Sequence, residues 1–335
     1  MGGEFGPSVT VPAVLDFLRT KPCATALVFG DDSKVRHYLE ASSGSEVFSR
    51  VKCVHSDLSI TDEEGPSSVL RKKQLSSMGL AVKAVSEQRA DACISAGSTG
   101  ALMALGLSNL KSLPGISRPA ICTTFPTING RSYVLDLGAN IQCTADQLYQ
   151  FALMASLTAK LMDGIVSPSV RLLNVGIEDT KGTTEVKRAA QLLEADHGIN
   201  YCGFIEGDGI FQGIADIVVC DGFSGNIALK TTEGFAGMIA NLLESLVTKN
   251  FLAKIALGLF SKSFTNLKTR LDPSLYNGAY LLGLNGIVVK SHGSASERAF
   301  GHALEVAYDA AQQNLPSALD PLLADQLMSE LEERK

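Results

Sequence analysis

Short apolar runs rich in β-branched residues alternate along this chain with segments whose apolar residues recur at helical spacing. Apolar runs that end in Gly, Ser, Asp or Asn occupy residues 25–30, 90–97, 132–140, 171–176, 215–222 and 286–293. Runs of this length, bounded by turn residues, are typical of buried strands. Segments of helical period lie between many of them, for example at 69–88, 144–164 and 183–198. The alternation predicts an α/β fold with a largely parallel sheet and helices on both faces.

The chain has the composition of one large folded unit. Its 335 residues are 45% hydrophobic, which is enough for a sizeable core, and they contain no fixed-period repeat or Pro/Ser-rich linker. We therefore expect a single domain over residues 1–335, with two lobes that share one continuous sheet. The net charge of −6 argues against nucleic acid as a partner.

The seven cysteines predict reduced thiols rather than a disulfide framework or a metal site. They are scattered, lie mostly within apolar runs, and lack Cys-x-x-Cys or Cys/His ligand spacing. The N-terminal residues MGGEFGPSVTV have no signal-peptide pattern, and no stretch offers the roughly 18 uninterrupted apolar residues of a spanning helix. We expect a cytoplasmic protein with at most a peripheral membrane contact.

Five of the predicted strands are followed by loops rich in glycine, amides, hydroxyls and charged residues. Ligands of parallel sheets bind beyond the carboxyl ends of strands, where helix N-termini offer free N–H groups to anions. The candidate binding residues are Gly97, Ser98, Thr99 and Gly100, then Asp136 and Asn140, then Glu178 and Lys181, then Asp221, Asn226 and Lys230, and last Lys290 and His292. Each loop alone could be a plain connection with capping side chains, His292 a structural histidine and Lys230 a solvated helix lysine. The recurrence of such loops, two of them with a lysine just after the apolar strand, favours an anion-binding site.

Familiar cofactor and hydrolase signatures are missing from the sequence. The segment GDGIFQG at 207–213 resembles a dinucleotide fingerprint, but three residues separate its second and third glycines, and a strand follows too soon for a helix. No GxxxxGK[ST], GxSxG or HExxH pattern occurs. We expect no nicotinamide, flavin or metal cofactor, and a site without a nucleophile and base pair.

A series of ordered motifs resembles one known family. The motifs are MGGEFGP, RKKQLSSM, SAGSTGALM, LDLGAN, NVGIEDTKG, GFIEG, CDGFSGNIALKTTEG and YNGAYLLGLNGIVVKSHGSA. Together they span nearly the whole chain, which resembles the acyl-acyl carrier protein:phosphate acyltransferases of bacterial phospholipid synthesis, the PlsX family. The sequence departs from the family pattern at Glu4, where Asp is usual, at Ser98, where Asn is common, and at Gly209, where an acid is common. Family members also carry a short strand before the motif that begins here at Met1.

The resemblance implies a homodimer with a fold similar to isocitrate and isopropylmalate dehydrogenases and to phosphotransacetylase. It implies transfer of a long fatty acyl chain from acyl carrier protein to inorganic phosphate, giving acyl phosphate for a downstream glycerol-3-phosphate acyltransferase. Phosphate is already an anionic nucleophile, so the reaction needs an anion cradle and oxyanion donors rather than a triad. On this basis we predict Lys181 and Asn226 as catalytic donors, and Asp221 as the residue that orients a lysine or the turn. The loop 97–100 would form an anion nest.

Three other functions compete with this interpretation. A phosphotransacetylase-like enzyme acting on short acyl-CoA would share the chemistry. A dehydrogenase of the isocitrate type would share the implied fold, but the sequence has no clear cofactor loop or cluster of metal-binding aspartates. A non-catalytic, membrane-associated scaffold that binds carrier protein would differ by giving no phosphate-dependent release of the carrier thiol.

The segment 239–270 predicts a protruding amphipathic helical hairpin, with Gly258 as the break. Between Ser245 and Leu271 the sequence has no acids and five basic residues, Lys249, Lys254, Lys262, Lys268 and Arg270. One interpretation is a pair of helices at a dimer interface. The family resemblance implies contact with an anionic membrane surface and with the acidic carrier protein.

Overall fold

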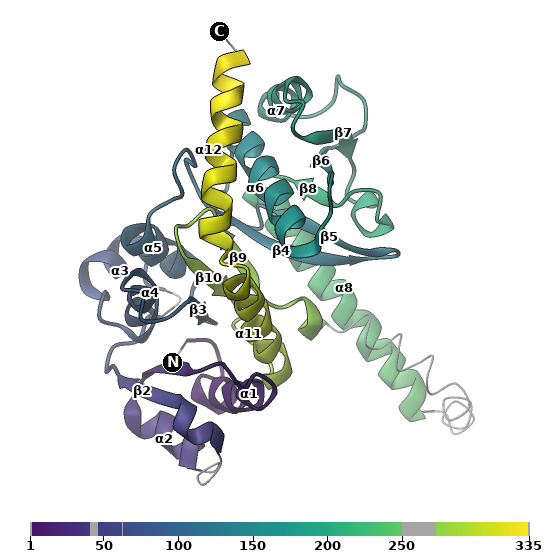
Figure 1. The fold of residues 1–335 in the computed structure, drawn as a ribbon. Helices are drawn as coiled ribbons and strands as arrows, with labels where there is room; N and C mark the ends of the chain where they lie inside the picture. Colours follow the sequence, from purple (N-terminus) through teal and green to yellow (C-terminus); the bar gives the residue numbers. More distant parts are fainter. Residues whose placement is uncertain (1, 41–45, 62, 250–272, 334–335) are drawn as a thin grey trace.

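The computed structural model describes residues 2–40, 46–61, 63–249 and 273–333 (Figure 1). Two sheets are present in these ranges: β1 pairs with β2, and an eight-stranded sheet has the order β3-β10-β9-β4-β5-β8-β6-β7. The strands are β1 Ala26–Gly30, β2 Val51–His55, β3 Ala92–Ser95, β4 Ala120–Thr127, β5 Gly130–Leu135, β6 Ser169–Leu173, β7 Asn200–Ile205, β8 Ile217–Val219, β9 Ala279–Leu282 and β10 Ile287–Lys290. The α-helices are α1 Pro7–Thr20, α2 Asp32–Glu40, α3 Pro66–Lys72, α4 Ser77–Ser86, α5 Thr99–Leu110, α6 Ala145–Asp163, α7 Thr184–Ala195, α8 Gly222–Lys249, α11 Glu297–Gln312 and α12 Leu315–Glu333.

The α/β class is confirmed, and each of the six predicted strands is present. The large sheet is mixed, however, because β9 pairs antiparallel with both β10 and β4, and β4 pairs antiparallel with β5. As a result β3 and β10 run in one direction, whereas β5, β8, β6 and β7 run in the other. The loops after β3 and β10 therefore leave one edge of the sheet, and the loops after β5, β6 and β8 leave the opposite edge.

The structure corrects the expectation that the two lobes share one continuous sheet, because it contains two separate sheets. β1 and β2 form a parallel pair of their own, and β3 is an end strand of the large sheet. A cavity of about 460 Å³ lies between β1 and β3, and consecutive residues of both strands line it. Because consecutive rather than alternate residues face this cavity, the two strands turn their backbone edges toward it.

Helix boundaries follow local capping signals. Thr144 and Gln147 form a capping box at the start of α6, and Gly164 ends that helix in the left-handed conformation, with φ 67°. The predicted helix at 69–88 is instead two helices, because Ser76 caps α4 by accepting a hydrogen bond from the Gly79 N–H.

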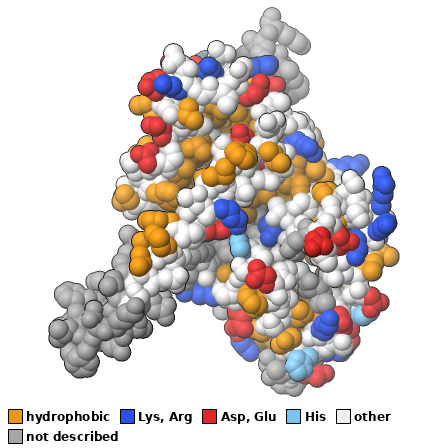
Figure 2. Space-filling model, turned by 180° about the vertical axis from the view of Figure 1, so that it is seen from behind, with side chains coloured by type: hydrophobic (Ala, Val, Ile, Leu, Met, Phe, Trp, Pro, Cys, Tyr) orange, Lys and Arg blue, Asp and Glu red, His pale blue; other side chains and the backbone are white. Residues whose placement is uncertain are grey.

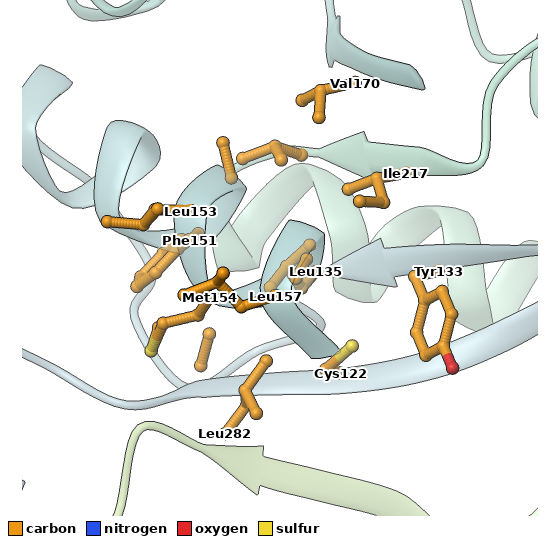
Figure 3. Close-up of a cluster of buried hydrophobic side chains, with 14 of the residues drawn as sticks. Cys122, Tyr133, Leu135, Phe151, Leu153, Met154, Leu157, Val170, Ile217 and Leu282 are labelled. Atoms are coloured by element: carbon orange, nitrogen blue, oxygen red, sulfur yellow. The ribbon is translucent and has the colours of Figure 1, made fainter. Parts of the chain in front are cut away.

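The main core lies where α6 packs on the large sheet. Figure 3 shows Phe151, Leu153, Met154 and Leu157 of α6 near side chains from the strands, among them Leu135. Burying a side chain of this size stabilises the fold by about 1.5–3 kcal/mol. This core fixes the strand ends from which the polar loops leave.

Candidate active site

The turn after β5 is built around the buried carboxylate of Asp136. This side chain is 0% exposed and accepts hydrogen bonds from the backbone N–H groups of Ile121 (2.9 Å), Ala139 (3.0 Å) and Asn140 (2.6 Å). The Asn140 amide also donates to it, at 3.0 Å. Burial raises the pKa of Asp136, and these donors oppose that change. The carboxylate oxygens are thus occupied by donors of their own loop and of β4, which makes Asp136 a residue that holds the turn.

The first turn of α8 packs against the Asp136 turn without space for side chains. A Cβ at Gly225 would lie 1.9 Å from the carbonyl oxygen of Asp136, and one at Gly222 would lie 2.5 Å from that of Asn140. Asp221 caps this turn, since its Oδ1 accepts from the Ser224 N–H at 2.7 Å. The predicted role of Asp221 as the residue that orients the turn agrees with this contact.

Asn226 lies at this junction with a free amide. Its side chain is beside Gly138, where a Cβ would approach the Asn226 Cβ to 3.4 Å. The residue is exposed, and within the described part of the chain its amide makes no hydrogen bond. A donor at the start of a helix, held against a tight turn, is suited to a developing oxyanion or to phosphate.

One helical turn along α8, Lys230 reaches the loop that follows β10. Its Nζ lies 3.0 Å from Nε2 of His292 and donates to Oε2 of Glu233 at 2.8 Å. The same carboxylate oxygen is 3.6 Å from His292 Nε2. Burial alone would raise the pKa of Glu233, but the neighbouring His292 ring, the hydrogen bond from Lys230 and the charge of Lys230 lower it below its usual value. Helix α8 therefore connects the loops of the two opposite sheet edges.

Asn277 fixes the loop after β10. Its Oδ1 accepts from the His292 N–H at 2.8 Å, and its Nδ2 donates to Ser291 Oγ at 2.8 Å and to the Ala299 carbonyl at 2.7 Å. Ser294 contacts the ring of His292, with 2.9 Å between Oγ and Nδ1. The histidine backbone and ring are thus both held before any ligand arrives.

The N-terminal residues close this region from another side. The Glu4 N–H donates to the carbonyl of Gly293 at 2.8 Å, and a Cβ on Gly2 would lie 2.8 Å from the nitrogen of Gly97. Glycine is required for this approach, because two backbones are in direct contact. The loop after β3 and the loop after β10 are therefore joined by the start of the chain.

The predicted anion nest, Gly97 to Gly100, lies at the start of α5. Ser98 occupies the N-cap position without a side-chain cap, and the Gly97 N–H donates to Ser95 Oγ at 3.2 Å. Gly100 is exposed and Gly97 is buried. The geometry leaves the first N–H groups of α5 without a capping side chain, and binding of an anion there stays a prediction.

The loop after β6 carries two exposed charged candidates, Glu178 and Lys181. Asn174 organises it by donating to the carbonyls of Gly176 at 3.0 Å and Lys181 at 3.3 Å. Glu178 and Lys181 are exposed, and no ion pair of the Lys181 ammonium occurs among the described residues. β6 neighbours β8, so this loop leaves the same sheet edge as the Asn226 turn. The joint role of Lys181 and Asn226 stays a prediction.

The remaining candidate and the nearby thiols are less available to a substrate. Lys290 is part-buried and its ammonium donates to the carbonyl of Ser291. Burial raises the pKa of Cys143 to about 12 and that of Cys220 well above 9.0. Neither thiol forms a nucleophilic thiolate near neutral pH. Across the described ranges, no group of three His, Cys, Asp or Glu side chains could hold a metal ion.

Glu233 and Asn277 are the residues that sequence reasoning missed. Each lies within a quoted motif, Glu233 in CDGFSGNIALKTTEG and Asn277 in YNGAYLLGLNG. The helical spacing of Lys230 and Glu233 was readable, since residues three apart are neighbours on a helix. The contact of this pair with His292, which is distant in the sequence, was not.

Known proteins resemble this chain in sequence and in fold. Residues 1–318 match a family model described as fatty acid synthesis protein. The chain is 46% identical over 329 residues to the phosphate acyltransferase of Shewanella amazonensis, covering 98% of this chain and 96% of the relative. A phosphotransacetylase from Streptococcus pyogenes has a TM-score of 0.58 at 20% identity, over 91% of this chain and 90% of that one. A 4-hydroxythreonine-4-phosphate dehydrogenase from Klebsiella pneumoniae gives 0.55 at 15%, over 93% and 98%. The two structural likenesses show the fold alone and agree with the predicted fold class.

Proposed function

The chain belongs to the fatty acid synthesis protein family, whose relatives here are named phosphate acyltransferase, and we propose that it moves a long-chain fatty acyl group from acyl carrier protein to inorganic phosphate. Acyl transfer to phosphate is the family's activity; the carrier-protein donor and the chain length are the proposed part. The acyl phosphate would serve a downstream glycerol-3-phosphate acyltransferase.

The proposed reaction balances without a further reactant. An oxygen of hydrogen phosphate attacks the thioester carbonyl carbon, and the C–S bond breaks as the C–O bond forms. The hydrogen of the phosphate passes to the departing sulfur, giving acyl phosphate and the carrier-protein thiol. A thiol with a pKa near roughly 8.5 leaves without a strong acid.

One observation supports this proposal most directly: α8 carries an amide, Asn226, that has no hydrogen-bond partner among the described residues, and one turn later a lysine held beside His292. Asn226 would donate to the oxyanion that develops on the carbonyl, and Lys230 with His292 would bind phosphate. Lys181 would add a cation from the neighbouring loop. The buried, protonated Cys143 and Cys220 are consistent with direct attack by phosphate rather than an acyl-enzyme.

The test is incubation of the protein with palmitoyl-acyl carrier protein and phosphate, with acyl phosphate detected by mass spectrometry. We expect acyl phosphate and free carrier thiol in equal amounts, both dependent on phosphate. Acetyl-CoA is the control donor. Formation of acetyl phosphate at a higher rate would favour the phosphotransacetylase-like alternative, and thiol release without phosphate would contradict the proposed reaction.

Membrane contact and homodimer formation are further parts of the proposal. Figure 2 shows hydrophobic side chains on α8 where it leaves the body of the molecule, and Phe235, Met238 and Leu242 are 60%, 50% and 52% exposed. The described residues include no helix long and apolar enough to cross a bilayer. Lys249 is the last residue of α8, and the other basic residues of the predicted hairpin, from Lys254 to Arg270, lie outside the described residues.

Exposed apolar side chains along a helix that leads into a basic segment fit an interfacial contact. A partner subunit could cover part of the same helix. Vesicle binding and solution mass measurements therefore test the two proposals separately.

A further inference from the structure

The side chains of Lys230 and His292 approach each other through two nitrogens that both act as donors, so their contact needs a shared acceptor. The Ser294 N–H points at Nδ1 of His292, at 3.2 Å, which puts the hydrogen of a neutral ring on Nε2. Lys230 Nζ and His292 Nε2 are then both donors, yet they are 3.0 Å apart. Oε2 of Glu233 is the atom that they share, at 2.8 Å from Nζ and 3.6 Å from Nε2.

The second oxygen of Glu233 has no partner among the described residues. Both contacts of this side chain use Oε2, and the side chain as a whole is 33% exposed. The neighbouring lysine and histidine lower the pKa of Glu233, so near neutral pH it is a carboxylate that can only accept hydrogen bonds. Two donors, Lys230 Nζ and His292 Nε2, and one acceptor, the Glu233 carboxylate, thus lie side by side where α8 meets the loop after β10.

A site with both donors and an acceptor is suited to distinguish hydrogen phosphate from sulfate, two anions of similar size and charge. Hydrogen phosphate, the form that predominates above the second pKa of roughly 6, keeps a hydrogen that it can donate, because this last hydrogen is lost only in strongly alkaline solution. Sulfate has none, so its oxygens would meet the Glu233 carboxylate with two acceptors facing each other and like charges in contact. A site that hydrogen-bonds a substrate hydrogen rejects an analogue without it, because the acceptor in the site is left facing another acceptor.

We propose that Glu233 is a specificity-determining residue that accepts the hydrogen of hydrogen phosphate and thereby excludes sulfate. The inference rests on the proposed binding of phosphate by Lys230 and His292. In the structure the Glu233 carboxylate lies beside both donors. When phosphate binds, they turn to its oxygens while Oε1 accepts its hydrogen. No covalent step is involved.

The test is calorimetric titration of the full chain with inorganic phosphate and, separately, with sulfate at pH 7.5 and constant ionic strength. Glu233→Gln keeps the size of the side chain but removes its charge and offers an amide that can donate to sulfate. We expect this variant to lower the ratio of phosphate affinity to sulfate affinity by about tenfold or more, the loss of one charge-assisted hydrogen bond. The expectation concerns the ratio, since loss of a negative charge helps both anions.

Glu87→Gln is the matched control. Glu87 also pairs with two cations, Arg89 at 2.8 Å and Lys83 at 3.5 Å, but at the end of α4. Its affinity ratio should equal that of wild type. An unchanged ratio in Glu233→Gln, or no phosphate binding by wild type, would overturn the inference. Selective phosphate binding without acyl phosphate formation would instead contradict the proposed function and leave this inference standing.

Discussion

Gly225 and Gly234 lie on the same helix, α8, and offer a paired test of how the Asp136 turn is packed. At Gly225 a Cβ would lie 1.9 Å from the backbone oxygen of Asp136 and 2.8 Å from Cys220 Sγ, so the oxygen is about 1 Å closer than the 3.0 Å that real contacts allow. At Gly234 a Cβ would meet nothing within 4 Å. Alanine is the better helix former at both positions, which leaves the steric clash as the difference.

The two substitutions are expected to change the free energy of unfolding in opposite directions. Gly234→Ala should stabilise the protein by about 0.5–1 kcal/mol, the helix-propensity gain of alanine over glycine. Gly225→Ala should lower the free energy of unfolding by about 3 kcal/mol, the upper part of the usual range for overpacking. The atom nearest to the new Cβ is the backbone oxygen of Asp136, which cannot rotate away. Urea unfolding followed by circular dichroism measures both, with the slope m as the check that the same surface is exposed.

The same pair tests the link from packing to function. Gly225→Ala would push the start of α8 from the Asp136 turn and move Asn226, so turnover should fall while Gly234→Ala stays near wild type. Equal stability of the Gly225→Ala variant and wild type would refute the argument, because it would mean that the turn yields without cost. A destabilised but fully active Gly225→Ala variant would separate the packing of this turn from catalysis.

Further predictions concern turnover, membrane contact and pH. Lys181→Ala and Asn226→Ala should each reduce turnover by roughly 10²-fold to 10³-fold with folding intact, the usual loss for one oxyanion donor, and near-normal kcat in both would remove them from the mechanism. Wild type should sediment with anionic but not neutral vesicles, and Lys254→Glu combined with Lys262→Glu should weaken this; equal sedimentation would exclude these lysines. The lowered pKa of Glu233 stabilises the fold above its unfolded value of 4.5, and this is lost as pH falls through the folded pKa. The difference in thermal stability between wild type and Glu233→Gln should therefore be largest near pH 7 and vanish in acid. A difference that does not depend on pH would contradict this.

Much of the local structure was readable from the sequence because it depends on neighbours in the chain. The runs at 25–30 and 286–293 contain β1 and β10, and the segment of helical period at 144–164 contains α6. The glycine segment at 207–213 is a short 3₁₀ turn, Gly209–Gln212, as expected of a segment too short for a cofactor-binding helix. β2, β4, β7 and β9 were not identified, and the single helix expected at 69–88 is broken at Ser76.

Asp136 illustrates why a polar residue after a strand is ambiguous. The sequence placed it among the substrate-binding candidates, but its oxygens are filled by N–H groups of its own turn and of Ile121 on β4. A carboxylate that binds a ligand and one that holds a turn have the same local sequence pattern. Only the position of the neighbouring strand decides which of the two it is.

The sequence by itself determined the alternation of strands and helices, their caps and the residue types of each loop, since hydrophobic periodicity and capping act within a few residues. The tertiary structure alone decided the strand directions, because a buried strand has the same apolar pattern whether its neighbour is parallel or antiparallel. Those directions send the loops to two sheet edges. Only the packing of α8 across them brings Lys230 and Glu233 to His292, and so creates the site.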